Sequence, residues 1–163
     1  MIVAGGGASG MAAAAFAARA GAKVLLLERN EKLGKKLYIT GKGRCNVTNA
    51  AERDAFFDNI PRNPRFLYAA FAALSNVEWM RTLEAWGVPL KVERGERVFP
   101  ASDRASDVTR AFERELARLG VEMRLGARVE SVLVEGGRVS GARLDTGEEL
   151  SCRGLVLATG GAS

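Results

Sequence analysis

The 163-residue sequence contains no histidine, and this absence removes the commonest general base and the commonest metal ligand of enzymes. A Ser-His-Asp triad and a histidine-based zinc site are therefore excluded within this chain. Cysteine is nearly as scarce, because Cys45 and Cys152 are the only two. They cannot form an all-cysteine zinc site or the disulfide framework of a small secreted domain. Chemistry that side chains cannot perform, such as hydride or electron transfer, would have to come from an organic cofactor.

Long apolar runs are also missing. No stretch approaches the roughly 20 apolar residues of a membrane span, and no basic segment precedes the first apolar run as it would in a signal peptide. Together with the scarcity of cysteine, these features predict a protein of the reducing cytoplasm that has no membrane partner. Hydrophobic residues make up 47% of the chain and charged residues 26%, a balance typical of a globular domain.

The charge is unbalanced toward the positive side, with a formal net charge of +5. A basic chain is compatible with nucleic-acid binding. Here, however, basic residues are scattered and many stand beside acids, as in Glu113-Arg114-Glu115. This pattern favours a solvated surface over a nucleic-acid-binding face, and part of the excess suits an anionic cofactor.

The most informative motif lies at the start of the chain. The apolar run Ile2-Val3-Ala4 leads directly into G-x-G-x-x-G, formed by Gly5, Gly7 and Gly10. An alanine-rich helical pattern over 8–20 follows, and a second apolar run over 23–28 ends on Glu28. This order is that of a dinucleotide-binding βαβ unit. A glycine-rich turn without a ligand is the alternative, and the complete flanking context disfavours it.

Each residue of the motif has a predicted role. Gly5 allows a tight turn after the strand, Gly7 lets the backbone approach a pyrophosphate, and Gly10 lets the helix pack closely on the sheet. The helix N-terminus offers free N–H groups and a partial positive charge to the phosphates. Glu28 is placed to accept hydrogen bonds from ribose hydroxyls.

Downstream of this unit the pattern becomes mixed. Residues 29–49 form a polar, glycine-containing stretch whose length indicates either a functional loop or a flexible surface loop. Apolar residues over 50–86 recur at helical spacing, and the aromatic side chains among them are interpreted as part of the core rather than as a ligand-binding site. A short hairpin is predicted over 90–99 and a helix after it.

The last forty residues alternate in polarity with a period of about two. Strands are predicted over 121–125, 129–134 and 139–144, in an antiparallel meander after the helix. A final apolar strand, 155–158, leads into Thr159-Gly160-Gly161, a second close approach of backbone to a ligand. Because no helix follows, we expect the chain to be the front part of a longer protein.

Four segments together resemble one known family. The first is the dinucleotide-binding fingerprint, which runs from the apolar run at Ile2 through Gly5, Gly7 and Gly10 to Glu28. The others are the stretch G-K-G-R-C-N-V-T-N over 41–49, R-V-F-P-A-S over 97–102, and V-L-A-T-G-G over 156–161. In content, order and spacing they are similar to the N-terminal portion of bacterial NAD(P)/FAD-dependent oxidoreductases called aminoacetone oxidase family FAD-binding enzymes, which are glutathione-reductase-like flavoproteins. G-R-C-N-x-T-N is the most specific of the four, and the resemblance covers essentially the whole chain.

The resemblance implies an α/β fold: a Rossmann-like FAD-binding domain, in which a parallel sheet is combined with an antiparallel β-meander, with a small and mainly helical insertion. It implies an FAD-binding part over 1–49, the insertion with its hairpin over 50–103, and a second FAD-binding part over 104–163. The implied activity is that of an FAD-dependent oxidoreductase acting on a small molecule, with NAD(P)H as a candidate electron donor. The fragment alone is expected to be inactive, and the rest of its own polypeptide is an expected partner.

The resemblance also implies which residues bind the cofactor. Lys42 departs from the family, because many members carry glycine at that position. The implied set is Gly5, Gly7, Ala8, Ser9, Gly10, Glu28, Arg29, Lys35, Lys36, Gly43, Arg44, Cys45, Asn46, Val129, Thr159, Gly160 and Gly161.

Two roles within this set can be made more specific. Arg44 is a candidate for stabilising negative charge on phosphate or on reduced flavin. Cys45 is interpreted as a buried structural cysteine rather than a redox thiol, because the C-x-x-C spacing of redox flavoproteins is absent.

Three alternatives to a flavin oxidoreductase stay open. An NAD-dependent dehydrogenase would also use Glu28, but the meander and the second glycine strand favour FAD, since a simple NAD domain continues with alternating βα units. A flavoprotein that acts on RNA is permitted by the positive charge, although nucleic acid is not the expected partner. A truncated, non-catalytic module would bind FAD weakly or not at all.

Overall fold

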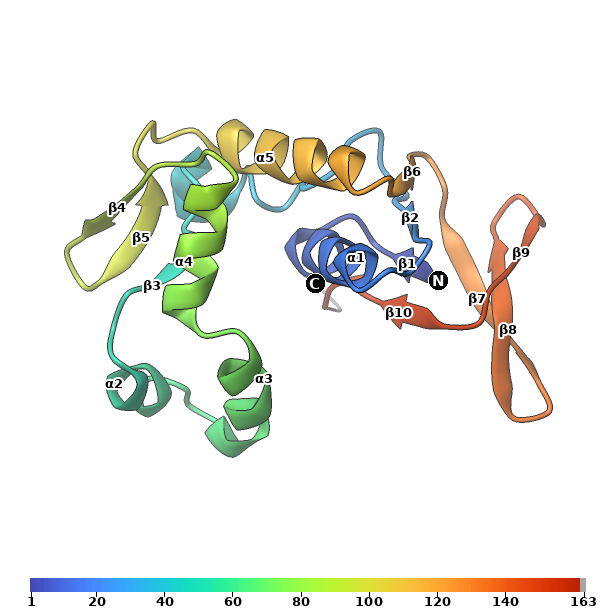
Figure 1. The fold of residues 1–163 in the computed structure, drawn as a ribbon, viewed down its shortest axis with the longest axis horizontal. Coiled ribbons are helices and arrows are strands. Elements are labelled where there is room, and N and C mark those ends of the chain that lie inside the picture. The colour runs from blue at the N-terminus through green and yellow to red at the C-terminus, as the bar shows by residue number, and fades with distance from the viewer. Residues whose placement is uncertain (162–163) are drawn as a thin grey trace. The chain divides into compact units, whose positions relative to one another are not determined.

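The computed structural model describes residues 1–161, and the chain forms two compact units (Figure 1). The first unit comprises residues 1–37 together with the chain from residue 112 onward, and the second comprises residues 38–111. Helix α5, Ala105–Arg118, begins in the second unit and ends in the first.

The first unit is built on a four-stranded parallel sheet with the order β10-β1-β2-β6. Its strands are β1 (Ile2–Ala4), β2 (Leu25–Leu27), β6 (Glu122–Arg124) and β10 (Leu155–Leu157). The central strands β1 and β2 consist of apolar residues, as expected for parallel strands buried on both faces. The parallel pairings place the carboxyl ends of β1, β2 and β10 at one edge, where α/β proteins bind their ligands.

Helix α1, Ala8–Arg19, connects β1 to β2 and packs against both strands and against β10 (Figure 1). Its inner face carries Met11, Ala14 and Ala15, all fully buried. Small side chains at these positions allow the helix axis to lie close to the sheet. The alanine-rich sequence therefore determines both the helix and its close packing.

The other face of the sheet packs against an antiparallel sheet of three strands. They are β7 (Val129–Glu135), β8 (Arg138–Leu144) and β9 (Glu149–Ser151), in the order β7-β8-β9. Between the two sheets lies a buried apolar cluster to which both sheets contribute. Its members are Ile2, Leu27, Ala127, Ala142 and Leu144.

One predicted part of the meander is wrong. The segment around Glu122–Arg124 is not antiparallel but pairs in parallel with β2 at the edge of the main sheet. The reason is that the long connection from β2 to β6, which contains the second unit and ends in α5, brings the chain back to the sheet parallel to β2. The third meander strand is instead Glu149–Ser151, which follows the turn at Thr146-Gly147.

The second unit combines a small antiparallel sheet with short helices. The sheet has the order β3-β5-β4, and the hairpin predicted over 90–99 supplies two of its strands. Part of the stretch 29–49, predicted to lack regular structure, is ordered, because Thr48–Asn49 pairs with β5. The elements are η1 (Thr40–Gly43), β3 (Thr48–Asn49), α2 (Arg53–Asp58), η2 (Pro64–Leu67), α3 (Tyr68–Ala73), α4 (Asn76–Ala85), β4 (Leu90–Glu93) and β5 (Arg97–Pro100).

The prediction that the aromatic side chains of 50–86 form a core is correct only in part. Phe57 is buried, but Phe66 is 78% exposed and Tyr68 is 42% exposed. Helices α2 and α3 have only six residues each, so they bring few side chains together. Their rings contact one another, with Phe57 and Tyr68 edge to face at 4.7 Å between centroids, instead of joining a larger core.

Among the described residues, no helix is both long enough and apolar enough to cross a membrane.

Candidate functional site

The turn between β1 and α1 can be formed only by glycine at two positions. Gly5 has a φ of 109°, and a Cβ there would overlap the carbonyl oxygen of Ala158. A Cβ on Gly10 would overlap the carbonyl oxygen of Gly5 and would lie 3.2 Å from the Cβ of Ala158. These contacts hold the start of α1 tightly against the ends of β1 and β10, which is the close packing that the fingerprint predicts.

Gly7 differs from these two glycines, because a Cβ on it would meet no atom within 4 Å. It is the N-cap of α1 and gives the helix no side-chain cap. Ala8 and Ser9, the next two residues, are exposed. The N-terminus of this twelve-residue helix is thus exposed, and no side chain at Gly7 covers its backbone N–H groups. This arrangement fits an anionic group such as a pyrophosphate.

Glu28 follows β2, and it is only 7% exposed. Its Oε2 accepts a hydrogen bond from the Gly6 backbone N–H at 2.6 Å, and its Oε1 accepts from the backbone and the side chain of Asn30 at 2.8 and 2.6 Å. The carboxylate therefore joins the glycine turn to the end of β2. Because a carboxylate oxygen can accept two hydrogen bonds, Oε2 retains capacity for a hydroxyl group.

Sequence reasoning missed several residues that build this turn. A Cβ on Gly6 would overlap the Leu33 side chain, which is buried, and the Gly6 carbonyl accepts a hydrogen bond from the Gly34 backbone N–H at 2.8 Å. The buried Leu-Gly pair at 33–34 thus supports the turn from the following loop. Its signal was a leucine directly before glycine among the charged and polar residues of 29–36.

The remaining predicted residues of the first unit occupy less enclosed positions. Arg29 and Lys36 are exposed, and the Nζ of Lys35 lies 3.3 Å from the Oδ1 of Asn30. Val129 begins β7 and packs against the apolar cluster between the sheets. Three exposed residues, Thr159, Gly160 and Gly161, follow β10 beside the contact of Gly5 with Ala158.

In the second unit, the G-K-G-R-C-N segment follows an unusual backbone path. Gly41, Lys42, Gly43 and Cys45 all have positive φ, at 58°, 58°, 88° and 64°. Lys42 and Cys45 carry side chains in this left-handed region, which costs about 1–2 kcal/mol for each L-residue. Neighbouring contacts must therefore hold the segment in place.

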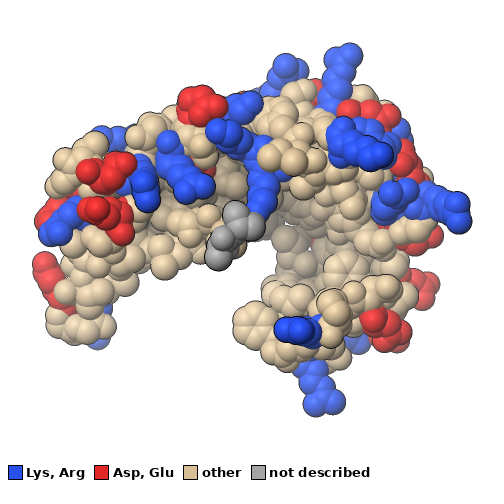
Figure 2. Space-filling model, turned by 180° about the vertical axis from the view of Figure 1, so that it is seen from behind, with Lys and Arg blue, Asp and Glu red and all other residues tan. Residues whose placement is uncertain are grey.

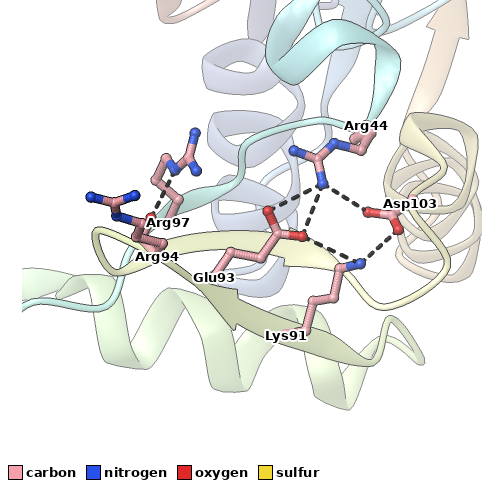
Figure 3. Close-up of polar contacts among 6 residues, drawn as sticks. All are labelled: Arg44, Lys91, Glu93, Arg94, Arg97 and Asp103. Carbon is pink, nitrogen blue, oxygen red and sulfur yellow. Dashed lines mark hydrogen bonds and ion pairs between the residues drawn. The ribbon is translucent and has the colours of Figure 1, made fainter.

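Arg44 takes part in a network of four charged side chains (Figure 3). Its Nη1 donates to Glu93 Oε1 and Oε2 at 2.9 and 3.2 Å and to Asp103 Oδ1 at 3.4 Å. Lys91 completes the network, with Nζ 2.6 Å from Asp103 Oδ2 and 3.4 Å from Glu93 Oε1. The hydrogen bond from Arg44 lowers the pKa of Glu93, and that from Lys91 lowers the pKa of Asp103.

The residues beside Arg44 are also held by internal contacts. Cys45 is buried, with 1% exposed, and this burial raises the pKa of its thiol. With its amide oriented to match its surroundings, Asn46 donates to the carbonyls of Val98 and Thr48 at 3.2 and 3.0 Å. A buried thiol with a raised pKa is a poor nucleophile, which agrees with the structural role predicted for Cys45.

Comparison with known proteins identifies the family. Residues 1–163 match the family described as HI0933-like protein Rossmann domain. The chain belongs to this family. The Rossmann-like α/β fold and the FAD cofactor predicted from the sequence are thereby confirmed.

Two curated relatives place this HI0933-like domain within longer proteins. It is 39% identical over 131 residues to a 3-dehydro-bile acid delta(4,6)-reductase of Clostridium scindens, covering 78% of this chain and 31% of that protein. It is 31% identical over 163 residues to a ribosomal RNA dihydrouridine synthase of Escherichia coli, covering 99% of this chain and 39% of that protein. The chain thus spans about a third of the length of these relatives.

Solved structures support the fold. The crystal structure of Thermovibrio ammonificans THI4 matches 98% of this chain and 56% of that chain with a TM-score of 0.68 and 18% sequence identity. At this identity the likeness concerns the fold alone.

Proposed function

We propose that this HI0933-like domain is the N-terminal FAD-binding part of a flavoprotein oxidoreductase. The observation that carries the proposal is the open N-terminus of α1, which is flanked by Gly7 and lies beside the buried carboxylate of Glu28. A helix N-terminus suits a pyrophosphate, and an acid after the second strand suits a ribose. The name of the Clostridium scindens relative, a reductase, supports the oxidoreductase class.

The predicted residues have distinct roles in this proposal. The backbone N–H groups at Ala8, Ser9 and Gly10 bind the pyrophosphate, and Glu28 accepts hydrogen bonds from the adenosine ribose. Lys35 and Lys36 add positive charge, and Arg29 follows Glu28 directly. Thr159, Gly160 and Gly161 bring a second stretch of backbone to the cofactor, and Val129 marks the strand assigned to the adenine. Gly43, Arg44, Cys45 and Asn46 are proposed as further cofactor-binding residues.

FAD, when bound, supplies hydride or electron transfer through its isoalloxazine ring. The residues of this chain bind and orient the adenosine diphosphate end. We further propose a small-molecule substrate, NAD(P)H as the electron donor, and the rest of the longer polypeptide as the partner that completes the site. The scarcity of cysteine supports a reducing, cytoplasmic setting, and the family resemblance supports a bacterial one.

The limits of the modules are part of the proposal. We assign residues 1–49 and 104–163 to the FAD-binding part and residues 50–103 to the insertion.

The decisive experiment is to purify the full-length protein and record its visible absorption spectrum, with and without added FAD. We expect the absorption bands of a bound flavin, and we expect Glu28→Ala to lower the fraction of protein that retains FAD. Glu31→Ala is the matched control, because Glu31 is exposed and lies in the same loop. A full-length protein that neither contains nor binds flavin would refute the proposal.

A second candidate function is flavin-dependent reduction of RNA. It is favoured by one observation, the 31% identity to the ribosomal RNA dihydrouridine synthase of Escherichia coli. The test is to incubate the reduced holoprotein with ribosomal RNA and to analyse the nucleosides by mass spectrometry. Appearance of dihydrouridine would establish this function, whereas turnover of a small-molecule substrate without any change in RNA would reject it.

A further inference from the structure

The side chain of Arg44 is half-buried, and its contacts come from its own unit. Its guanidinium donates to both oxygens of Glu93 and to Asp103 (Figure 3). Its Cζ lies 4.1 Å from the centroid of the Phe99 ring. Phe99 itself is 1% exposed. A stacked and charge-paired guanidinium of this kind is fixed in one orientation.

The charges of this network cancel. Arg44 and Lys91 supply two positive charges, and Glu93 and Asp103 supply two negative charges, all linked by contacts of 2.6 to 3.4 Å. An anion that approached Arg44 would also meet the two carboxylates. A phosphate at Nη1 would therefore have to compete with the carboxylates of Glu93 and Asp103.

The residues on either side of Arg44 also contact Phe99 or other parts of the second unit. A Cβ on Gly41 would lie 2.8 Å from Phe99 Cε1 and 3.0 Å from the Asn46 backbone nitrogen, so the chain passes directly against the ring. The buried side chain of Cys45 and the amide of Asn46 make further internal contacts. By contrast, Lys42 and Gly43 are exposed. The segment thus packs through Gly41, Arg44 and Cys45 and leaves its bend at Lys42 and Gly43 exposed.

We propose that Arg44 is a positioning residue, which acts with Glu93, Asp103 and Phe99 to hold residues 40–46 in their left-handed path so that the exposed bend at Lys42 and Gly43, and not the guanidinium, meets the cofactor. This inference rests on the proposed function and deepens it. It gives Glu93 and Asp103, two acids, a favourable role in binding an anionic cofactor.

The direction in which Glu93→Gln changes FAD affinity distinguishes a positioning role of Arg44 from direct contact with a phosphate. If Arg44 contacts a phosphate, Glu93→Gln removes a competing acid and leaves FAD affinity unchanged or raises it. If Arg44 positions the segment, Glu93→Gln weakens the network and lowers affinity, as Arg44→Ala does. The effects of the two changes must then be strongly non-additive, because both break the same contact.

The experiment measures FAD dissociation constants by flavin fluorescence on full-length apoprotein. It compares the wild type with Arg44→Ala, Glu93→Gln and the double variant. We expect each single change to weaken binding about tenfold and the double variant to be no weaker than Arg44→Ala. The matched control is the exposed pair Arg143–Glu149, whose variants Arg143→Ala and Glu149→Gln should bind FAD as the wild type does.

A second measurement tests the segment without the cofactor. Trypsin cleavage after Lys42 in folded apoprotein should be faster in Arg44→Ala and Glu93→Gln than in the wild type. The variant Arg44→Lys, which keeps the charge but loses the planar stack, should be intermediate in both measurements.

The outcomes distinguish the inference from the proposed function. Unchanged or tighter FAD binding in Glu93→Gln, or additive effects in the double variant, would overturn the positioning role while the protein still binds flavin. If the folded wild type binds no flavin and cleavage after Lys42 is still faster in the variants, the network holds the segment but the flavin function is rejected.

Discussion

At the scale of single residues, the fingerprint glycines separate into two groups with different duties. Gly10 is required by the protein itself, because a Cβ would overlap the Gly5 carbonyl. We predict that Gly10→Ala lowers the free energy of unfolding by about 2 kcal/mol or more, as overpacking of a tight contact does. Urea unfolding followed by circular dichroism measures this change. A variant as stable as the wild type would contradict the geometry of the turn.

Gly7 is free of such contacts, so its replacement separates folding from binding. We predict that Gly7→Ala lowers stability by less than about 1 kcal/mol, because alanine is a poorer N-cap than glycine. Its methyl group, however, points into the open space at the start of α1 that we assign to the pyrophosphate. FAD titration of the folded variant should therefore show clearly weakened binding, and wild-type affinity would argue against that assignment.

Lys42 is a residue whose replacement should stabilise the protein. Its φ of 58° and ψ of 44° lie in the left-handed region. Glycine removes the strain of about 1–2 kcal/mol but loses about 0.5–1 kcal/mol through its greater freedom in the unfolded chain. We predict that Lys42→Gly raises the free energy of unfolding by up to about 1 kcal/mol. Lys35→Gly, at a position outside the left-handed region, should not be stabilising.

At the scale of elements, α1 and α5 are joined by one buried acid. Glu115 of α5 is 7% exposed and accepts hydrogen bonds from Arg118 at 2.7 Å and from Arg19 of α1 at 2.7 Å. The hydrogen bond from Arg118, together with that from Arg19, lowers the pKa of Glu115 from 4.5 to about 2. A lowered pKa means that the unfolded state takes up its proton first as the pH falls.

The resulting stability is present above the unfolded pKa of 4.5 and is lost as the pH falls toward 2. We predict that Glu115→Gln is less stable than the wild type at pH 7 and that the difference narrows below pH 4.5. Urea midpoints measured across this range test the prediction. The stability difference between Arg118→Gln and the wild type should also narrow below pH 4.5, but less strongly, because Arg19 still donates to Glu115. A stability difference that is the same at all pH values would refute the role of the Glu115–Arg118 ion pair.

The elements that could be predicted from the sequence are those with local signals. The strand Ile2–Ala4, the helix that begins at Ala8, and the hairpin near 90–99 each carry a clear pattern of apolar residues and glycines. Polarity in Glu122–Arg124 indicated a strand but not its direction, because strand direction depends on the crossover helix. The network around Arg44 was not predictable, since its partners stand 49 and 59 positions away.

At the scale of the whole molecule, the net charge of +5 is spread over a surface that also carries acids. The face shown in Figure 2 carries lysines and arginines as well as acids. Many of the arginines are paired with acids and are therefore partly neutralised. The ion pairs include Arg19–Glu115, Arg44–Glu93, Arg118–Glu115, Arg124–Glu148 and Arg143–Glu149. Affinity for a nucleic acid grows with the number of phosphates that unpaired cations neutralise, so this surface should bind RNA weakly.

This charge pattern gives a prediction that also bears on the RNA candidate. Fluorescence anisotropy with a short single-stranded RNA should show binding by this 163-residue chain only at low salt, with a salt slope smaller in magnitude than about 3, the value for roughly three or four phosphate contacts. If the full-length protein acts on RNA, its slope should be clearly steeper, because the contacts then come from other parts of the polypeptide. A steep slope for this chain alone would place RNA recognition on its own surface, and the exposed cations Arg29, Lys32, Lys35 and Lys36 would be the first to replace.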